Sequence, residues 1–108
     1  MILDVFTTSV VNEMTLSQEL EIKKMIDNPK NSTAKSVLLE LTMNDCFTLN
    51  QMAEVVMKVQ KLLAEDIYMV LTSNTDSNLS HTTSYLRLTL SDNKEDFKSK
   101  ENMGLVTN

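Results

Sequence analysis

Glycine is almost missing from this sequence, because Gly104 is the only one among 108 residues. Loops that hold phosphate groups with their backbone N–H groups need several glycines close together. The chain therefore cannot form a glycine-rich nucleotide site of its own. From the residues alone we expect no bound cofactor.

Cysteine and histidine are equally scarce, with Cys46 and His81 as the single examples. One cysteine cannot form a disulfide within the chain, which suits a reducing cytoplasm. A metal site needs three or four converging ligands, and these two residues stand in separate predicted loops. We expect no metal site, no Cys–His nucleophile pair and no catalytic residue. Aspartates near strand and helix ends, such as Asp66, are typical of capping and solubilising positions.

Basic residues are outnumbered, with 15 acidic against 10 basic side chains and a net charge of −5. This sign repels a phosphate backbone, so we expect no nucleic-acid partner. No apolar run reaches the roughly 18 residues that span a bilayer, and residues 1–4 lack the basic segment of a secretory signal. We therefore expect a cytoplasmic protein without direct membrane insertion.

Apolar residues occur in patterns that predict four strands and two helices. Short apolar and β-branched runs predict strands, and apolar residues at three- and four-residue steps predict helices. Capping-box spacing begins each helix, at Thr15-Leu16-Ser17-Gln18 and at Thr48-Leu49-Asn50-Gln51, and Pro29 follows the first helix. The predicted strands are 2–7, 36–42, 67–72 and 84–90, and the predicted helices are 16–27 and 49–64.

The order β-α-β-α-β-β predicts an α+β fold, an α/β two-layer sandwich. Right-handed crossovers place both helices on one face of a four-stranded mixed sheet. We expect strands 67–72 and 84–90 to form an antiparallel hairpin. The chain then divides into a two-layer domain over 1–91 and a charged, flexible tail over 92–108.

Several strings in this order resemble the C-terminal domain of FtsZ, the tubulin-like bacterial cell-division GTPase. The family has a Gly-Ser-Gly strand end, a Gly-Ala-Lys-Gly-Val-Leu string, an Asn-Ile-Thr-Gly-Gly strand end, a Leu-Thr-Leu helix start and an Asn-Glu-Ala-Ala-Glu helix. The resemblance covers roughly residues 2–91. The similar strings here are Thr7-Thr8-Ser9, Thr33-Ala34-Lys35-Ser36-Val37-Leu38, Glu40-Leu41-Thr42-Met43-Asn44, Phe47-Thr48-Leu49 and Asn50-Gln51-Met52-Ala53-Glu54.

The family's glycines are all replaced in these strings. Turns after the first and second strands must therefore use Thr, Ser and Asn, and a positive φ costs a non-glycine residue about 1 kcal/mol or more. The family has a short apolar tail peptide that binds its membrane tethers. Met103-Gly104-Leu105-Val106 resembles that peptide only weakly.

The resemblance implies an assembly role in cell division at the septum. Such a domain docks the neighbouring subunit in a filament, and GTP is held by an N-terminal domain that this chain does not contain. The chain alone is then not an enzyme, and its partners are proteins, either FtsZ-like subunits or division proteins. Loop residues at the strand ends are the candidate interface: Asp45, Asp76 and His81.

Two other functions remain open. The chain could be a stand-alone protein-interaction or regulatory module of the same fold, which the lost glycines favour. It could also be a small oligomeric ligand-binding domain or enzyme, because two-layer sandwiches host many functions. That last alternative needs a pocket between protomers, since a chain of this size leaves little room for a cleft.

Overall fold

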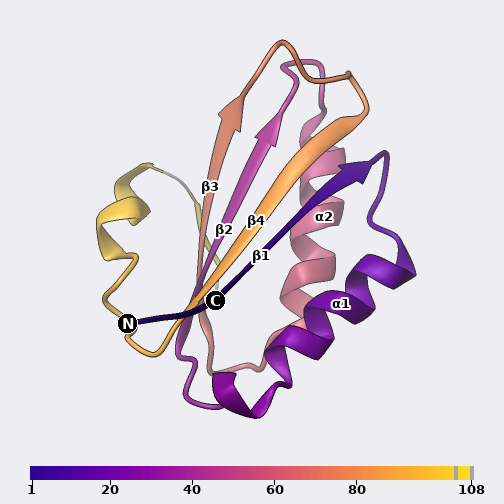
Figure 1. Cartoon of the computed structure of the whole chain (residues 1–108). Coiled ribbons are helices and arrows are strands. Elements are labelled where there is room, and N and C mark those ends of the chain that lie inside the picture. Colours follow the sequence, from indigo (N-terminus) through magenta and orange to yellow (C-terminus); the bar gives the residue numbers. More distant parts are fainter. Residues whose placement is uncertain (104, 108) are drawn as a thin grey trace.

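The chain folds into one β-sheet with two helices on the same face (Figure 1). This computed structural model describes the backbone of residues 1–103 and 105–107 and the side chains of residues 1–100. The stretch 103–106 contains Gly104, which lies outside the described residues. The elements in chain order are β1 (Ile2–Val11), α1 (Leu16–Ile26), η1 (Pro29–Asn31), β2 (Ser36–Met43), α2 (Leu49–Leu62), β3 (Tyr68–Thr75), β4 (Thr83–Ser91), η2 (Lys98–Met103) and β5 (Leu105–Thr107).

Both α-helices begin at the predicted capping boxes. The Thr15 hydroxyl accepts the Gln18 N–H at 3.1 Å, and Gln18 Oε1 accepts the Thr15 N–H at 2.9 Å. Thr48 and Gln51 form the same reciprocal pair, also at 3.1 and 2.9 Å. These bonds satisfy backbone donors that a helix start otherwise leaves unpaired. The predicted four strands and two helices are therefore all present, as an α+β two-layer arrangement.

The strand order in the sheet is β1-β4-β2-β3-β5, and it corrects the predicted hairpin. Strand β4 pairs antiparallel with both β1 and β2, while β3 pairs in parallel with β2. The predicted hairpin between strands 67–72 and 84–90 is wrong, because β2 lies between β3 and β4. Leu86, Leu88 and Leu90 are each no more than 1% exposed, and a strand that buries such a row is best placed inside the sheet, where both of its edges are paired. Residues 76–82 then cross the end of β2.

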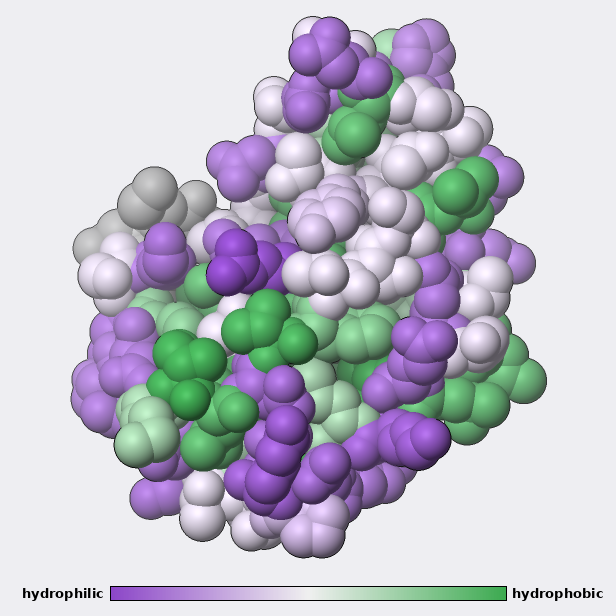
Figure 2. All heavy atoms as spheres, viewed as in Figure 1, coloured by the Kyte–Doolittle hydropathy of each residue, from purple (hydrophilic) through white to green (hydrophobic). Residues whose placement is uncertain are grey.

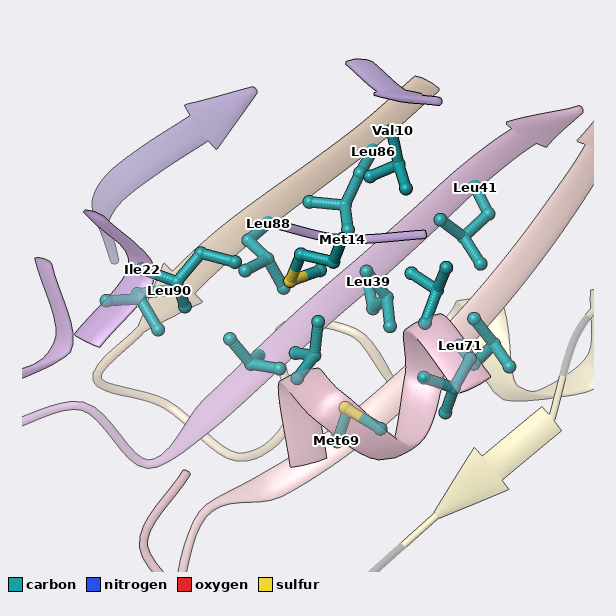
Figure 3. Packing of buried hydrophobic residues seen from close by; sticks show 14 of the residues in the cluster. Val10, Met14, Ile22, Leu39, Leu41, Met69, Leu71, Leu86, Leu88 and Leu90 are labelled. Carbon is teal, nitrogen blue, oxygen red and sulfur yellow. The ribbon is translucent and has the colours of Figure 1, made fainter. Parts of the chain in front are cut away.

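The main core lies between the sheet and the two helices (Figure 3). Alternate residues of the strands point to this face, as the period of a strand requires. Helices α1 and α2 cover them with Ile22 and with three valines of α2, so both helices lie on one face as predicted. The strand residues in this core are Val10, Val37, Leu39, Leu41, Met43, Met69, Leu71, Leu86, Leu88 and Leu90.

The second face of the sheet has a smaller apolar cluster, which the C-terminal segment covers. Phe97 is 5% exposed and packs with Leu38 and Val70. The sequence predicted a flexible tail from residue 92 onward; instead this segment folds onto the sheet, and β5 adds a fifth strand beside β3. The charged residues around Phe97 gave no sequence signal of this contact. Burying one aromatic ring nevertheless stabilises a fold by about 2 kcal/mol or more.

The first residue of the chain also contacts the segment that follows β4. The Met1 ammonium group donates to the Asp92 carboxylate at 2.8 Å and to the Asp96 carboxylate at 2.9 Å. The Ser91 hydroxyl donates to Asp96 as well. Together these bonds hold the pKa of the Asp96 carboxyl below its ordinary value, with the Ser91 bond as the largest cause.

Neither α1 nor α2 combines the length and the apolar character that a membrane-crossing helix needs, and no other helix within the described residues does so.

The carboxylate of Asp4 joins β1 to η1. It accepts a hydrogen bond from Asn31 Nδ2 at 3.1 Å, forms an ion pair with Lys30 Nζ at 3.3 Å, and accepts the Val5 N–H at 3.0 Å. These donors, Asn31 first, hold the pKa of Asp4 below its ordinary 3.8. A carboxyl whose folded pKa is depressed stabilises the fold above its unfolded pKa, and this contribution is lost as the pH falls through the folded pKa.

We predict that Asp4→Asn lowers the free energy of unfolding at neutral pH. The difference from the wild type should shrink as the pH falls below 3.8, where the wild-type carboxyl also becomes protonated. Urea denaturation over this pH range measures the difference. Asp66→Asn, an exposed position outside this network, controls for the loss of one negative charge. A gap between wild type and Asp4→Asn that stays constant with pH would contradict the assignment.

We also predict that Phe97→Ala lowers the free energy of unfolding by about 3 kcal/mol, because it empties a buried aromatic position. Equilibrium denaturation of the whole chain measures this. Ser99→Ala changes an exposed neighbour in η2 and should have little effect. Equal stability of the two variants would mean that Phe97 does not pack on the sheet.

Candidate functional site

The three residues predicted as an interface lie at one end of the sheet. Asp45 stands in the loop between β2 and α2, and Asp76 and His81 stand in the loop between β3 and β4. Because β2 and β3 run in parallel, both loops leave the same end of the sheet, and Figure 1 shows them together at the top. Asp45 and His81 are exposed, and Asp76 is half-buried. We call this region, residues 44–48 and 76–82, the loop end.

Asn44 braces the two loops against each other. Its side chain is buried, with 4% of the residue exposed. Asn44 Nδ2 donates to the carbonyl of Leu79 at 2.8 Å and lies 3.4 Å from that of Ser77, both in the β3–β4 loop. Asn44 Oδ1 accepts the Cys46 N–H at 2.8 Å within its own loop. A buried amide with both ends occupied fixes the relative position of the backbones that it joins.

Backbone hydrogen bonds add two further links at the loop end. The Asp76 N–H donates to the Met43 carbonyl at 2.7 Å, and the Asn12 N–H donates to the Thr82 carbonyl at 2.7 Å. Asn12 has a φ of 64°, the one positive φ of a non-glycine residue that the structure records. Asparagine tolerates this left-handed conformation better than most residues. The turn after β1 thus uses an asparagine and is tied to the loop end.

The first strand is longer than predicted, which moves that turn. Strand β1 continues to Val11, in register with Thr83, rather than ending at residue 7. Thr7, Thr8 and Ser9, which align with the family's Gly-Ser-Gly strand end, therefore lie inside the strand and not in a turn.

The loop end presents polar groups to solvent. The Asp45 carboxylate has no hydrogen-bond or ion-pair partner within residues 1–100, while Asp76 Oδ1 accepts the Asn78 N–H at 2.9 Å. Figure 2 shows hydrophilic and intermediate residues at this end, with small hydrophobic groups among them. Such a surface suits contact with a polar or charged protein surface, where charge sets orientation and association rate.

The described residues show no metal-binding cluster. Among them, no three His, Cys, Asp or Glu side chains converge so that they could hold a metal ion. Cys46 is exposed, and its backbone N–H donates to Asn44 Oδ1.

Sequence reasoning missed Asn44, the residue that organises this end. An asparagine directly after a strand, two positions before Cys46, is the pattern of a side chain that accepts a backbone N–H two residues on. That local signal was present. Its bonds to Ser77 and Leu79 had no local signal, because they join segments 33 and 35 residues apart.

Comparison with known proteins supports the fold and goes no further. No protein-family model and no curated protein sequence matches the chain. Among solved structures, a W319Y mutant of FtsZ from M. jannaschii matches with a TM-score of 0.51 and 18% identity, over 81% of this chain and 27% of that one. An empty FtsZ dimer from the same organism matches with a TM-score of 0.48 and 20% identity, over 79% and 26%. The fold is thus similar to the C-terminal domain of FtsZ, and the chain spans about a quarter of the FtsZ chains that it matches.

We predict that Asn44→Ala lowers the free energy of unfolding by about 2 kcal/mol, because it leaves part-buried backbone groups of both loops without partners. NMR spectra should show changes at Cys46, Ser77 and Leu79, with little change at the opposite end of the sheet. Asn78→Ala, an exposed asparagine of the same loop, is the matched control. Wild-type stability and an unchanged spectrum would show that Asn44 does not brace the loops.

Proposed function

We propose that the chain is an assembly domain that docks the neighbouring subunit of an FtsZ-type filament through its loop end. The observation that carries the proposal is the gathering of Asp45, Asp76 and His81 on one braced end of an FtsZ-like fold. Filament assembly at the septum, and a cytoplasmic location, follow from the same resemblance.

The bracing is what makes the loop end suitable for docking. Loops that must be ordered on binding lose conformational entropy, and this cost reduces affinity. Here the hydrogen bonds of Asn44 and the bond from Asp76 to Met43 already hold the loops in the free chain. The exposed Asp45 carboxylate and the half-buried Asp76 carboxylate can then meet a basic or polar face of the next subunit with little rearrangement.

In this proposal the chain alone is not an enzyme and binds no cofactor. GTP would be held by a separate N-terminal domain of the FtsZ type, and this chain would contact the nucleotide face of the next subunit. The single glycine of the sequence supports this division, since a phosphate-binding loop cannot be made here.

A stand-alone interaction module is the second candidate, and one observation favours it. Phe97 and its neighbours in η2 cover apolar residues on the helix-free face of the sheet. This part of the chain thus closes a surface that another domain would otherwise have to cover. In that case the loop end would bind a different protein, by the same charged residues.

We predict that the double charge reversal Asp45→Lys with Asp76→Lys weakens docking by about tenfold or more, because it reverses the charge at the centre of the contact. The purified chain is immobilised, and binding of FtsZ-type subunits from the same source cells is measured with GTP present. Surface plasmon resonance at two salt concentrations gives both the affinity and its charge dependence.

Glu21→Lys with Glu54→Lys is the matched control, since it changes the net charge equally at exposed sites on the two helices. The proposal requires wild-type binding by this control. Equal loss in both double variants would assign the effect to net charge. Binding that survives reversal at Asp45 and Asp76 would remove the loop end from the interface, and a different captured protein would support the second candidate.

A further inference from the structure

A surface hollow lies at the opposite end of the sheet from the loop end. Its volume is about 320 Å³, and it is bounded by the end of α1, η1 and the turn between α2 and β3. Its walls combine apolar side chains with two exposed aspartates. The lining includes Ile26, Ile67 and Leu90 together with Asp27, Asp66 and Asn31.

Asn31 supplies an acceptor that the protein leaves unused. The residue is 2% exposed. Its Nδ2 donates to the Met25 carbonyl at 2.8 Å and to the Asp4 carboxylate at 3.1 Å. Because both partners are acceptors, the atom that faces them is the amide nitrogen. Asn31 Oδ1 is buried and has no hydrogen-bond partner. Leaving a buried carbonyl oxygen without a partner costs free energy. Because Asn31 is one of the residues that line the hollow, a ligand donor that reaches this oxygen would recover part of that cost.

Several backbone donors around the hollow are already engaged. The Ala34 N–H donates to the Asn31 carbonyl at 3.0 Å, and the Ile67 N–H donates to the Ala64 carbonyl at 3.1 Å. The Asp27 N–H donates to the Lys23 carbonyl at 2.9 Å. The charged groups left for a ligand are the carboxylates of Asp27 and Asp66, beside the Ser32 hydroxyl and the Asn31 carbonyl oxygen.

The two aspartates differ in how much of their charge is available. Asp27 Oδ1 forms an exposed ion pair with Lys23 Nζ at 3.3 Å. Asp66 has no ion-pair partner within residues 1–100. A cation in the hollow would thus find one unpaired carboxylate and one that it can share.

We propose that this hollow binds a primary ammonium group carried on a short alkyl stem. The ammonium group has three N–H donors and no acceptor, which matches the carboxylates and the Asn31 carbonyl oxygen. The stem would lie against Ile26, Ile67 and Leu90. A bare metal ion would leave these apolar walls unused, and no three ligand side chains of the metal-binding kinds converge in the described part of the chain. The group could come from a free amine or from a lysine of a partner protein.

The test is a titration of the isotope-labelled whole chain with n-butylammonium chloride, followed by NMR. We expect saturable shifts of the Asn31 side-chain amide and of the backbone amides of Asp27 and Asp66. Asp66→Asn should weaken binding about tenfold, as expected for the loss of a charged partner. Glu13→Gln, which removes an exposed carboxylate from the turn after β1, should bind as the wild type does.

Two further titrations separate the possible ligands. n-Butanol has a similar stem without the charge, and we expect it to bind at least about tenfold more weakly. A blocked lysine, with its α-amino and carboxyl groups capped, should bind more tightly than butylammonium if the natural source is a protein side chain, and less tightly if it is a free amine. Equal binding of butanol and butylammonium, full binding by Asp66→Asn, or shifts produced by calcium chloride alone would each overturn the proposal.

Discussion

The burial of one face of β4 is the constraint on which the rest of the fold depends. Leu86, Leu88 and Leu90 lie in the middle of the main core, where α1 and α2 pack against the sheet. In the sheet, β4 pairs on both edges and so separates β1 from β2. The chain between β3 and β4 is then forced across the end of β2. That crossing brings the β3–β4 loop onto the β2–α2 loop and so creates the loop end.

The polar features at the two ends of the sheet depend on buried asparagines in similar ways. Asn44 joins two loops and uses both ends of its amide. Asn31 joins η1 to α1 and β1 but uses only its amide nitrogen. Asn44 therefore braces the loops at one end of the sheet, while Asn31 leaves a buried carbonyl oxygen unpaired near the other end. The two proposed sites lie at opposite ends of the sheet, so each can be altered without direct contact with the other.

The sequence was informative wherever the signal was local. The capping boxes at Thr15 and Thr48 fixed both helix starts, and alternation in 84–90 identified the face that β4 buries. Strand order had no local signal, because β4 and β3 are neighbours in the chain but not in the sheet. Phe97 was overlooked among charged residues, since a single aromatic ring has no periodicity. The candidate residues came from the family resemblance, whereas Asn44, which holds them together, needed contacts between distant segments.

Docking through the loop end can be tested with the single cysteine, because Cys46 is exposed in the β2–α2 loop beside Asp45. A thiol-reactive photocrosslinker on Cys46 would capture whatever protein meets this end in an extract of the source cells. The account predicts a crosslink to the nucleotide face of an FtsZ-type subunit. A matched variant, Cys46→Ser with Thr33→Cys, moves the probe to an exposed position near the start of β2 and should not give that product. The same crosslink from both positions, or none to an FtsZ-type subunit from Cys46, would contradict the account.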